Sequence, residues 1–147
     1  MKAMWLLIPA VIAVGGCQRK KGLDATDAWV RLAAVRDRPS AAYFTLHGDA
    51  KDRTLISVTS PVAIRAEMHE SMNHSGMMSM APITTVALPA GGTVKFGPGG
   101  KHVMLYFVNP GVKPGWTMDL RFTFADGTIF VRRAKVVGPG DPPPAKE

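Results

Sequence analysis

Cysteine is almost absent from this 147-residue sequence, in which Cys17 is the only one. A single cysteine cannot form a disulfide within the chain, and structural zinc sites of the cysteine type need several thiolates. A blue-copper electron-transfer site also needs a thiolate ligand. Electron transfer of that kind and cysteine-based catalysis would therefore both depend on Cys17.

The sequence also lacks an apolar run of the roughly 20 residues that a membrane-spanning helix needs. Residues 1–16 contain an early lysine and then a short apolar run, which is typical of a secretory signal peptide. Val14-Gly15-Gly16-Cys17 resembles a bacterial lipobox, in which the cysteine is lipidated and becomes the first residue of the mature chain. We therefore predict a lipoprotein-type signal peptide and lipidation of Cys17. The alternative is cleavage to a soluble periplasmic protein.

Acidic residues are outnumbered: 11 Asp and Glu accompany 18 Lys and Arg, which gives a formal net charge of +7. Three of the basic residues directly follow Cys17, in a segment that we interpret as a tether (17–26): Arg19, Lys20 and Lys21. Basic residues at such a position are attracted to anionic lipid headgroups. No stripe of basic residues interleaved with aromatic ones occurs, so we do not expect nucleic-acid binding.

The sequence also shows no helical periodicity. From about residue 27 to residue 137, apolar and polar residues alternate instead, as in β-strands. In residues 116–124 every second residue is apolar, which predicts a strand with one face in a core. Asp126-Gly127 then predicts a tight hairpin turn. Short strands separated by turn residues are typical of a Greek-key β-sandwich. We predict one all-β domain at 27–137, followed by an extended tail at 138–147. The other expected strands are 29–33, 41–46, 54–59, 62–68 and 128–137.

Donors for a soft metal are concentrated in one stretch of the chain. Residues 68–80 hold five of the nine methionines and two of the four histidines, and a third histidine follows at position 102. Four donors fit the pattern H-x10-M-x21-H-x-M: His69, Met80, His102 and Met104. Residues i and i+2 of a strand share a face, so His102 and Met104 should be presented together. We predict a metal site near the surface, covered by a Met-rich loop over residues 69–80.

Two imidazoles and two thioethers are neutral donors, and thioethers favour Cu(I) over zinc, calcium or magnesium. No thiolate, open carboxylate or general base is evident beside them, so the pattern indicates binding and release of the ion rather than an enzyme. Glu70 is a candidate to orient His69. Met68 and Met118 alternate with apolar neighbours and are expected to pack in the core. Further methionines and a histidine of the same stretch are candidates for auxiliary ligands or a capture surface: Met72, His74, Met77 and Met78.

Several segments together resemble the periplasmic copper chaperones of the PCu(A)C family: AWVR from Ala28, RPSAAYFTL from Arg38, His69-Glu70, PAGGTV from Pro89 and PGGKHVML from Pro98. The resemblance covers most of residues 27–137. It implies a cupredoxin-like β-sandwich that binds one Cu(I) through the matching residues His69, Met80, His102 and Met104.

The resemblance also implies delivery of copper in the periplasm, towards the Cu(A) centre in subunit II of cytochrome c oxidase or a Sco-type protein. We expect a monomer, anchored to the membrane through Cys17. The tail contains no histidine or methionine, which argues against a second copper site there, one that would bind Cu(II). The alternative function is an envelope β-sandwich interaction module, with the Met-rich loop as an apolar docking surface.

Overall fold

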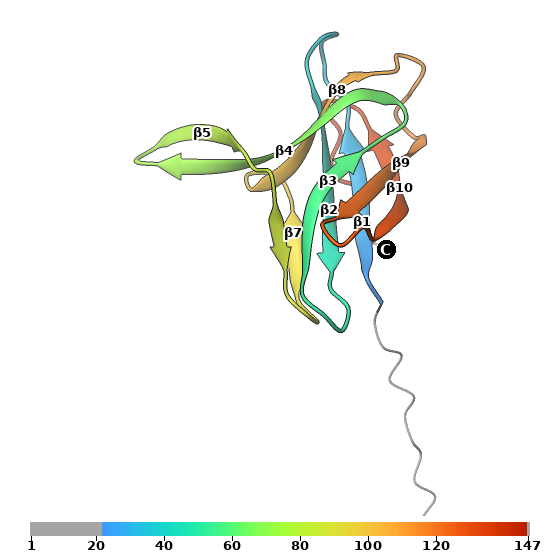
Figure 1. The fold of residues 1–147 in the computed structure, drawn as a ribbon. Helices are drawn as coiled ribbons and strands as arrows, with labels where there is room; N and C mark the ends of the chain where they lie inside the picture. Colours follow the sequence, from blue (N-terminus) through green and yellow to red (C-terminus); the bar gives the residue numbers. More distant parts are fainter. Residues whose placement is uncertain (1–21, 147) are drawn as a thin grey trace, which may run out of the picture.

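A computed structural model describes residues 22–146, and within this range the chain is all-β (Figure 1). Its strands are β1 (Asp24–Arg31), β2 (Ser40–His47), β3 (Arg53–Thr59), β4 (Ala63–His74), β5 (Met77–Pro82), β6 (Val86–Leu88), β7 (Thr93–Phe96), β8 (Lys101–Val108), β9 (Thr117–Phe124) and β10 (Ile129–Val137).

The strands form a continuous sheet in the order β5-β4-β8-β7-β2-β1-β10-β9-β3-β6, with an additional pairing of β8 with β2. The sheet folds into the two layers of a sandwich, and β3 and β4 come into contact although they lie far apart in the strand order (Figure 1). β1 pairs with β2 antiparallel and with β10 parallel. The predicted all-β Greek-key sandwich is confirmed.

The core lies between the two layers and is built from the inward residues of the alternating strands. Phe44 stacks on Phe96 with ring centroids 4.4 Å apart and meets the edge of Phe122 at 4.8 Å, so aromatic pairs join β2, β7 and β9. The largest fully buried side chains are Phe44, Phe96, Phe122, Phe124, Leu46, Leu55, Leu88, Leu105, Leu120, Val30 and Val103.

The alternation predicted for residues 116–124 is confirmed from Met118 to Phe124, whose apolar residues are buried. Trp116 departs from the pattern and is 58% exposed, because it precedes β9 and belongs to the turn that leads into this strand. The predicted turn at Asp126-Gly127 is confirmed: Gly127 has φ +85 and its N–H donates to the carbonyl of Phe124.

An ion cluster around Arg53 ties the loop after β2 to the β9–β10 turn. The Arg53 guanidinium donates to Asp49 Oδ2 at 2.7 Å, to Asp126 Oδ2 at 2.5 Å and to Thr128 Oγ1 at 2.8 Å. The hydrogen bond from Arg53 holds the pKa of Asp49 at about 2, below its usual value of 3.8. The pKa of Asp126 is also lowered, chiefly by hydrogen bonds from Thr128.

Residues 24–26, predicted as part of the tether, belong to the first strand of the sandwich. β1 begins at Asp24, three residues before the predicted start at 27, and β10 ends at Val137. Residues 138–146 contain no strand, and Asp141 holds this segment to β1 through its carbonyl, which accepts from Arg31 Nη2 at 3.3 Å. The predicted signal peptide and Cys17 lie outside the described residues. In residues 22–146 no helix has the length and apolar character to cross a membrane.

Candidate metal site

The Met-rich stretch is a β-hairpin, so the prediction of an irregular loop over residues 69–80 is wrong. β4 continues to His74 and β5 begins at Met77, and the two strands pair in an unbroken register from His69↔Pro82 to His74↔Met77. The hairpin projects from the sandwich at the left of Figure 1. The polar composition suggested a loop, but backbone pairing satisfies the amide groups of such residues equally well.

A two-residue turn of Ser75 and Gly76 closes this hairpin. Both residues have positive φ, +51 and +82, as a type I′ hairpin turn requires. The Oδ1 of Asn73 accepts a hydrogen bond from the N–H of Gly76 at 3.1 Å. Local turn chemistry therefore fixes the register of the hairpin, and with it the face on which each methionine lies.

The strand register brings three of the four predicted donors together. β4 and β8 are antiparallel neighbours in which His69 lies directly opposite His102, and Glu67 lies opposite Met104. Opposite residues of an antiparallel pair share a face, and so do residues two apart on one strand. His69, His102 and Met104 thus lie on one face, which we call the near face. The two imidazole centroids are 6.0 Å apart.

Met80 also belongs to the near face, because it pairs with Ser71, two residues from His69. It is 58% exposed, whereas His69 and His102 are only 9% and 7% exposed. The prediction of a site near the surface therefore fits Met80, whereas both histidine rings are buried. The predicted donors therefore differ in solvent exposure: the two nitrogen donors are buried, and the sulfur donor Met80 is exposed.

His102 has a defined tautomer. Its Nδ1 lies 2.9 Å from the carbonyl oxygen of Gly100, and because a carbonyl only accepts, Nδ1 carries the proton. In the neutral ring Nε2 then presents a lone pair. A backbone carbonyl that holds the second ring nitrogen in this way is the usual arrangement around a metal-ligating histidine.

His69 has a ring nitrogen without a partner. Its buried Nδ1 makes no hydrogen bond to any atom of residues 22–146, while its Nε2 lies 3.7 Å from Glu67 Oε2. A buried polar atom left unpaired costs free energy of about 1–3 kcal/mol. Such an atom needs an explanation, and a role as a metal ligand is one that also suits the neighbouring donors.

Glu67, and not Glu70, is the acidic residue beside His69. Glu70 lies one residue further along β4, on the opposite face, where its Oε1 accepts from Lys101 Nζ at 2.9 Å. The sequence-based suggestion that Glu70 orients His69 is therefore wrong. Strand alternation from His69 could have identified Glu67, since residues i and i−2 share a face.

Tyr106 is a further residue that the sequence analysis missed. Its hydroxyl donates to Met104 Sδ at 3.8 Å, and its ring lies beneath the guanidinium of Arg65 at 4.1 Å. Arg65 Nε in turn lies 3.4 Å from Glu67 Oε1. Tyr106, Arg65 and Glu67 thus form a polar chain that borders Met104 and His69 on the near face.

The auxiliary candidates are divided between the two faces of the hairpin. Met78 pairs with Asn73 and lies on the near face, because Asn73 is two residues beyond Ser71. Met72, His74 and Met77 lie on the opposite face, which we call the far face, since His74 pairs with Met77 and Met72 is two residues before His74. The sequence analysis grouped these four residues, and only the register separates them.

The methionines assigned to the core are confirmed: Met68 is 5% exposed and Met118 is 4% exposed. His47 hydrogen-bonds to Thr26 Oγ1 at 2.8 Å through Nε2 and takes no part in the near face. No three His, Cys, Asp or Glu side chains of residues 22–146 gather into a potential metal site. A site built on His69 and His102 would therefore depend on the methionine sulfurs.

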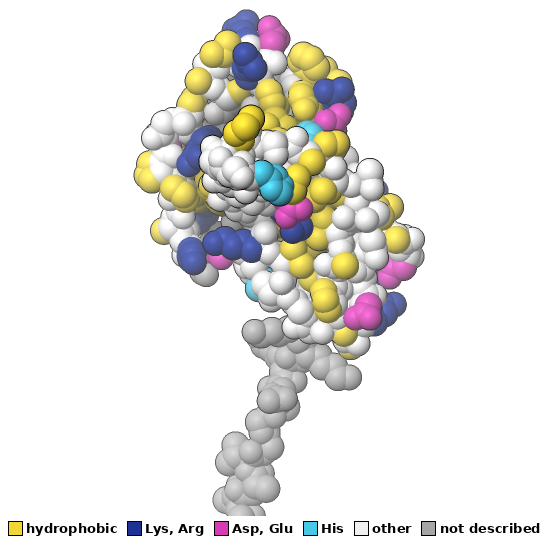
Figure 2. Space-filling model, turned by 90° about the vertical axis from the view of Figure 1, so that its left-hand side faces the viewer, with side chains coloured by type: hydrophobic (Ala, Val, Ile, Leu, Met, Phe, Trp, Pro, Cys, Tyr) yellow, Lys and Arg dark blue, Asp and Glu magenta, His cyan; other side chains and the backbone are white. Residues whose placement is uncertain are grey.

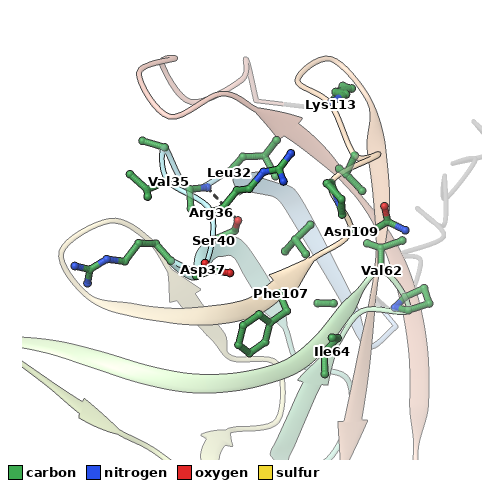
Figure 3. Close-up of a pocket in the computed structure, with 18 residues that line it drawn as sticks. Leu32, Val35, Arg36, Asp37, Ser40, Val62, Ile64, Phe107, Asn109 and Lys113 are labelled. Carbon is green, nitrogen blue, oxygen red and sulfur yellow. Dashed lines mark hydrogen bonds between the residues drawn. The ribbon is translucent and has the colours of Figure 1, made fainter.

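A cleft of about 730 Å³ lies elsewhere on the sandwich (Figure 3). It is bounded by the β1–β2 loop at 32–38, by Ile64 at the start of β4 and by Phe107 near the end of β8. Strand alternation from Val103 and Leu105 would place Phe107 in the core, but its φ of +54 takes it out of this alternation and it is 54% exposed. The cleft is lined without any histidine, methionine or cysteine, so it lacks soft-metal donors.

Comparison with solved structures identifies the class of domain. The chain superimposes on the copper-bound PCuAC domain from PmoF2 with a TM-score of 0.65 and 19% identity, covering 80% of this chain and 93% of that one. It matches the solution structure of CuI-DR1885 from Deinococcus radiodurans with a TM-score of 0.56 and 29% identity, over 84% and 83% of the two chains. The fold is the cupredoxin-like β fold of the PCuAC domains, and the resemblance to that family is confirmed.

The sequence identifies the family itself. Residues 23–136 match the family described as "LpqE-like: Putative lipoprotein LpqE-like", and the chain belongs to this family. A curated relative, "Putative lipoprotein Lxx21020" of Leifsonia xyli subsp. xyli, is 28% identical over 127 residues, which cover 82% of this chain and 72% of the relative.

Proposed function

We propose that this protein is a copper chaperone that binds one Cu(I) through His69, Met80, His102 and Met104. The observation that carries the proposal is the pairing of the two histidines: they lie directly opposite each other on β4 and β8, with ring centroids 6.0 Å apart and Met104 on the same face. Two solved structures with this fold are described as copper-bound or CuI-containing.

The donor set supports the choice of ion. Thioether and imidazole ligands suit Cu(I), whereas calcium and magnesium require oxygen donors. The lone pair on His102 Nε2 and the unpaired Nδ1 of His69 are both available to a metal ion. Glu67 lies beside His69, but its charge is compensated by Arg65 at 3.4 Å, so it adds no net charge to the neutral donor set.

The gradient of exposure across the donors favours transfer over permanent storage. The histidines are buried on the near face, but Met80 lies on the projecting hairpin and is 58% exposed. An incoming protein could replace the exposed thioether first, without unfolding the body. We propose that the protein acts by binding and releasing copper and is not an enzyme.

We propose the envelope as the place of action, with the domain tethered to a membrane through lipidated Cys17 on the periplasmic side. Both the matching family and the curated relative are named as lipoproteins. A monomer would then deliver copper to the Cu(A) centre in subunit II of cytochrome c oxidase or to a Sco-type protein. Thiolate ligands in such a recipient would draw Cu(I) from a site that has only neutral donors.

The binding step is tested by anaerobic titration of Cu(I) against a competing chelator. One tight equivalent is expected, and it should be lost in His102→Ala and weakened in Met80→Leu. His47→Ala is the matched control, because His47 lies away from the near face and should leave binding unchanged. X-ray absorption on the loaded protein should count two nitrogen and two sulfur neighbours. Full retention of the tight equivalent in His102→Ala would disprove this site.

The delivery step requires its own measurement. Copper-loaded protein is mixed with the soluble domain of an oxidase subunit II, or with a Sco-type protein, and the metal content of each is measured after separation. Transfer to one recipient and not the other would identify the partner. Copper that stays on this protein in both mixtures would contradict a delivery role and favour the alternative of an interaction module.

A further inference from the structure

The hairpin tip carries donors that the proposed site does not use. The far face presents Met72, His74 and Met77, and two of these side chains are well exposed, since Met77 is 76% and Met72 is 39% exposed. Figure 2, which views the molecule from the side on which the hairpin projects, shows histidine and hydrophobic side chains at the surface. Exposed methionines on a projecting hairpin do not contribute to a core.

The register brings these three donors within reach of one another. His74 and Met77 form the last pair before the turn, so their Cβ atoms lie about 4.5–5.5 Å apart, as in other directly opposed pairs. Met72 is two residues from His74 on the same strand, which places it about 7 Å away on the same face. Methionine has three rotatable side-chain bonds, so both thioethers can close on an ion held by the imidazole.

The surroundings of the far face also suit a cation bound by neutral ligands. Towards the body, the next residue of β4 on this face is Glu70, whose charge is compensated by Lys101 at 2.9 Å. No excess charge of either sign therefore borders the three donors on this side. Asn73, the polar residue between Met72 and His74, lies on the other face and holds the turn through Gly76.

We propose that Met72, His74 and Met77 form a second binding site for a soft monovalent ion, Cu(I) or Ag(I), on the far face of the hairpin tip. One imidazole and two thioethers are neutral soft donors, as at the near face, but they number three and are exposed to solvent. This site is therefore expected to bind more weakly and exchange faster than the buried histidine pair. The inference goes beyond the proposed function, because it does not require the near-face site.

Methionine methyl groups report on both sites separately. The full chain, labelled with ¹³C at the methionine methyl groups, is titrated with Ag(I), a soft monovalent probe that does not undergo redox change. The first equivalent should shift the signals of Met80 and Met104. The second should shift those of Met72 and Met77, which lie on the opposite face.

Variants assign the second equivalent to its ligands. Met72→Leu/His74→Gln/Met77→Leu keeps the apolar volume of the methionines and should lose the second equivalent while it retains the first. Met78→Leu is the matched control, because Met78 lies at the same tip on the near face, and it should retain both equivalents. Met80→Leu should weaken only the first equivalent.

Three results would overturn the proposal: a single equivalent that shifts only Met80 and Met104, a second equivalent that persists in the triple variant, or a second equivalent that shifts methyl signals other than those of Met72 and Met77. Failure of the near-face site gives a different result. In that case Met80 and Met104 would not respond, while the signals of Met72 and Met77 would still shift and the triple variant would still abolish that response.

Discussion

The sandwich body and the projecting hairpin use the same residue type in opposite ways. In the body, Met68 and Met118 are 5% and 4% exposed and fill the core. On the hairpin, Met77, Met78 and Met80 are 76%, 65% and 58% exposed. Burial contributes to stability through the apolar area removed from water, and exposure leaves the sulfur free to bind. Stability and metal binding should therefore be separable between the two regions.

The largest difference between the two regions is expected when methionine is replaced by alanine in each of them. Met118→Ala should lower the free energy of unfolding by about 2–5 kcal/mol, because it leaves a cavity in the core. Met77→Ala, on the exposed tip, should change it by no more than about 0.5 kcal/mol. Chemical denaturation of both variants checks the difference. Equal losses would show that the hairpin methionine is packed and that the two regions are not distinct.

A second test acts on the hairpin through its backbone. Gly76 has φ +82 and open space around the position of a Cβ atom, so Gly76→Ala meets no clash and only the left-handed conformation is penalised. That cost is about 1–2 kcal/mol. Hydrogen exchange of the amides in residues 72–79 should accelerate while core amides of β9 stay protected. Gly140→Ala is the control, because the space around its Cβ position is equally open but its φ is not positive. Loss of core protection in Gly76→Ala would show that hairpin and body unfold together.

Acid should act on the body through the Arg53 cluster. Asp49 has a folded pKa of about 2 against an ordinary value of 3.8, so the stability it contributes is present above about pH 4 and is lost as the pH falls towards 2. Thermal unfolding from pH 5 to pH 2 should therefore show a smaller loss of stability in Asp49→Asn than in the unsubstituted chain. Identical pH profiles would remove Asp49 from the acid response.

The smallest expected effect is at Tyr106, whose hydroxyl donates to Met104 Sδ at 3.8 Å. Tyr106→Phe removes this weak hydrogen bond and keeps the ring beside Arg65. We expect a change in Cu(I) affinity of less than about tenfold, measured by chelator competition, because hydrogen bonds to a thioether are weak. Unchanged unfolding midpoints would show that the effect belongs to the site. A loss of binding as large as in His102→Ala would contradict this and show that the Tyr106 hydroxyl is itself required for Cu(I) binding.

The sequence by itself determined the β character of the domain. Alternation in residues 118–124, the Asp126-Gly127 turn and the absence of helical periodicity depend only on neighbouring residues, and the structure agrees with each. The pairing of His102 with Met104 on one face follows from the period of a strand in the same local way. The candidate donors themselves could be named from their chemistry and spacing.

Only the tertiary structure decided what surrounds those donors. Which strands become neighbours depends on contacts between distant residues, so the opposition of His69 and His102 and the burial of both rings could not be deduced from local pattern. The division of the tip residues between two faces required the register set by the turn at Ser75-Gly76. A shift of one residue in that register would exchange the near and far faces, because side chains alternate along a strand with a period of two.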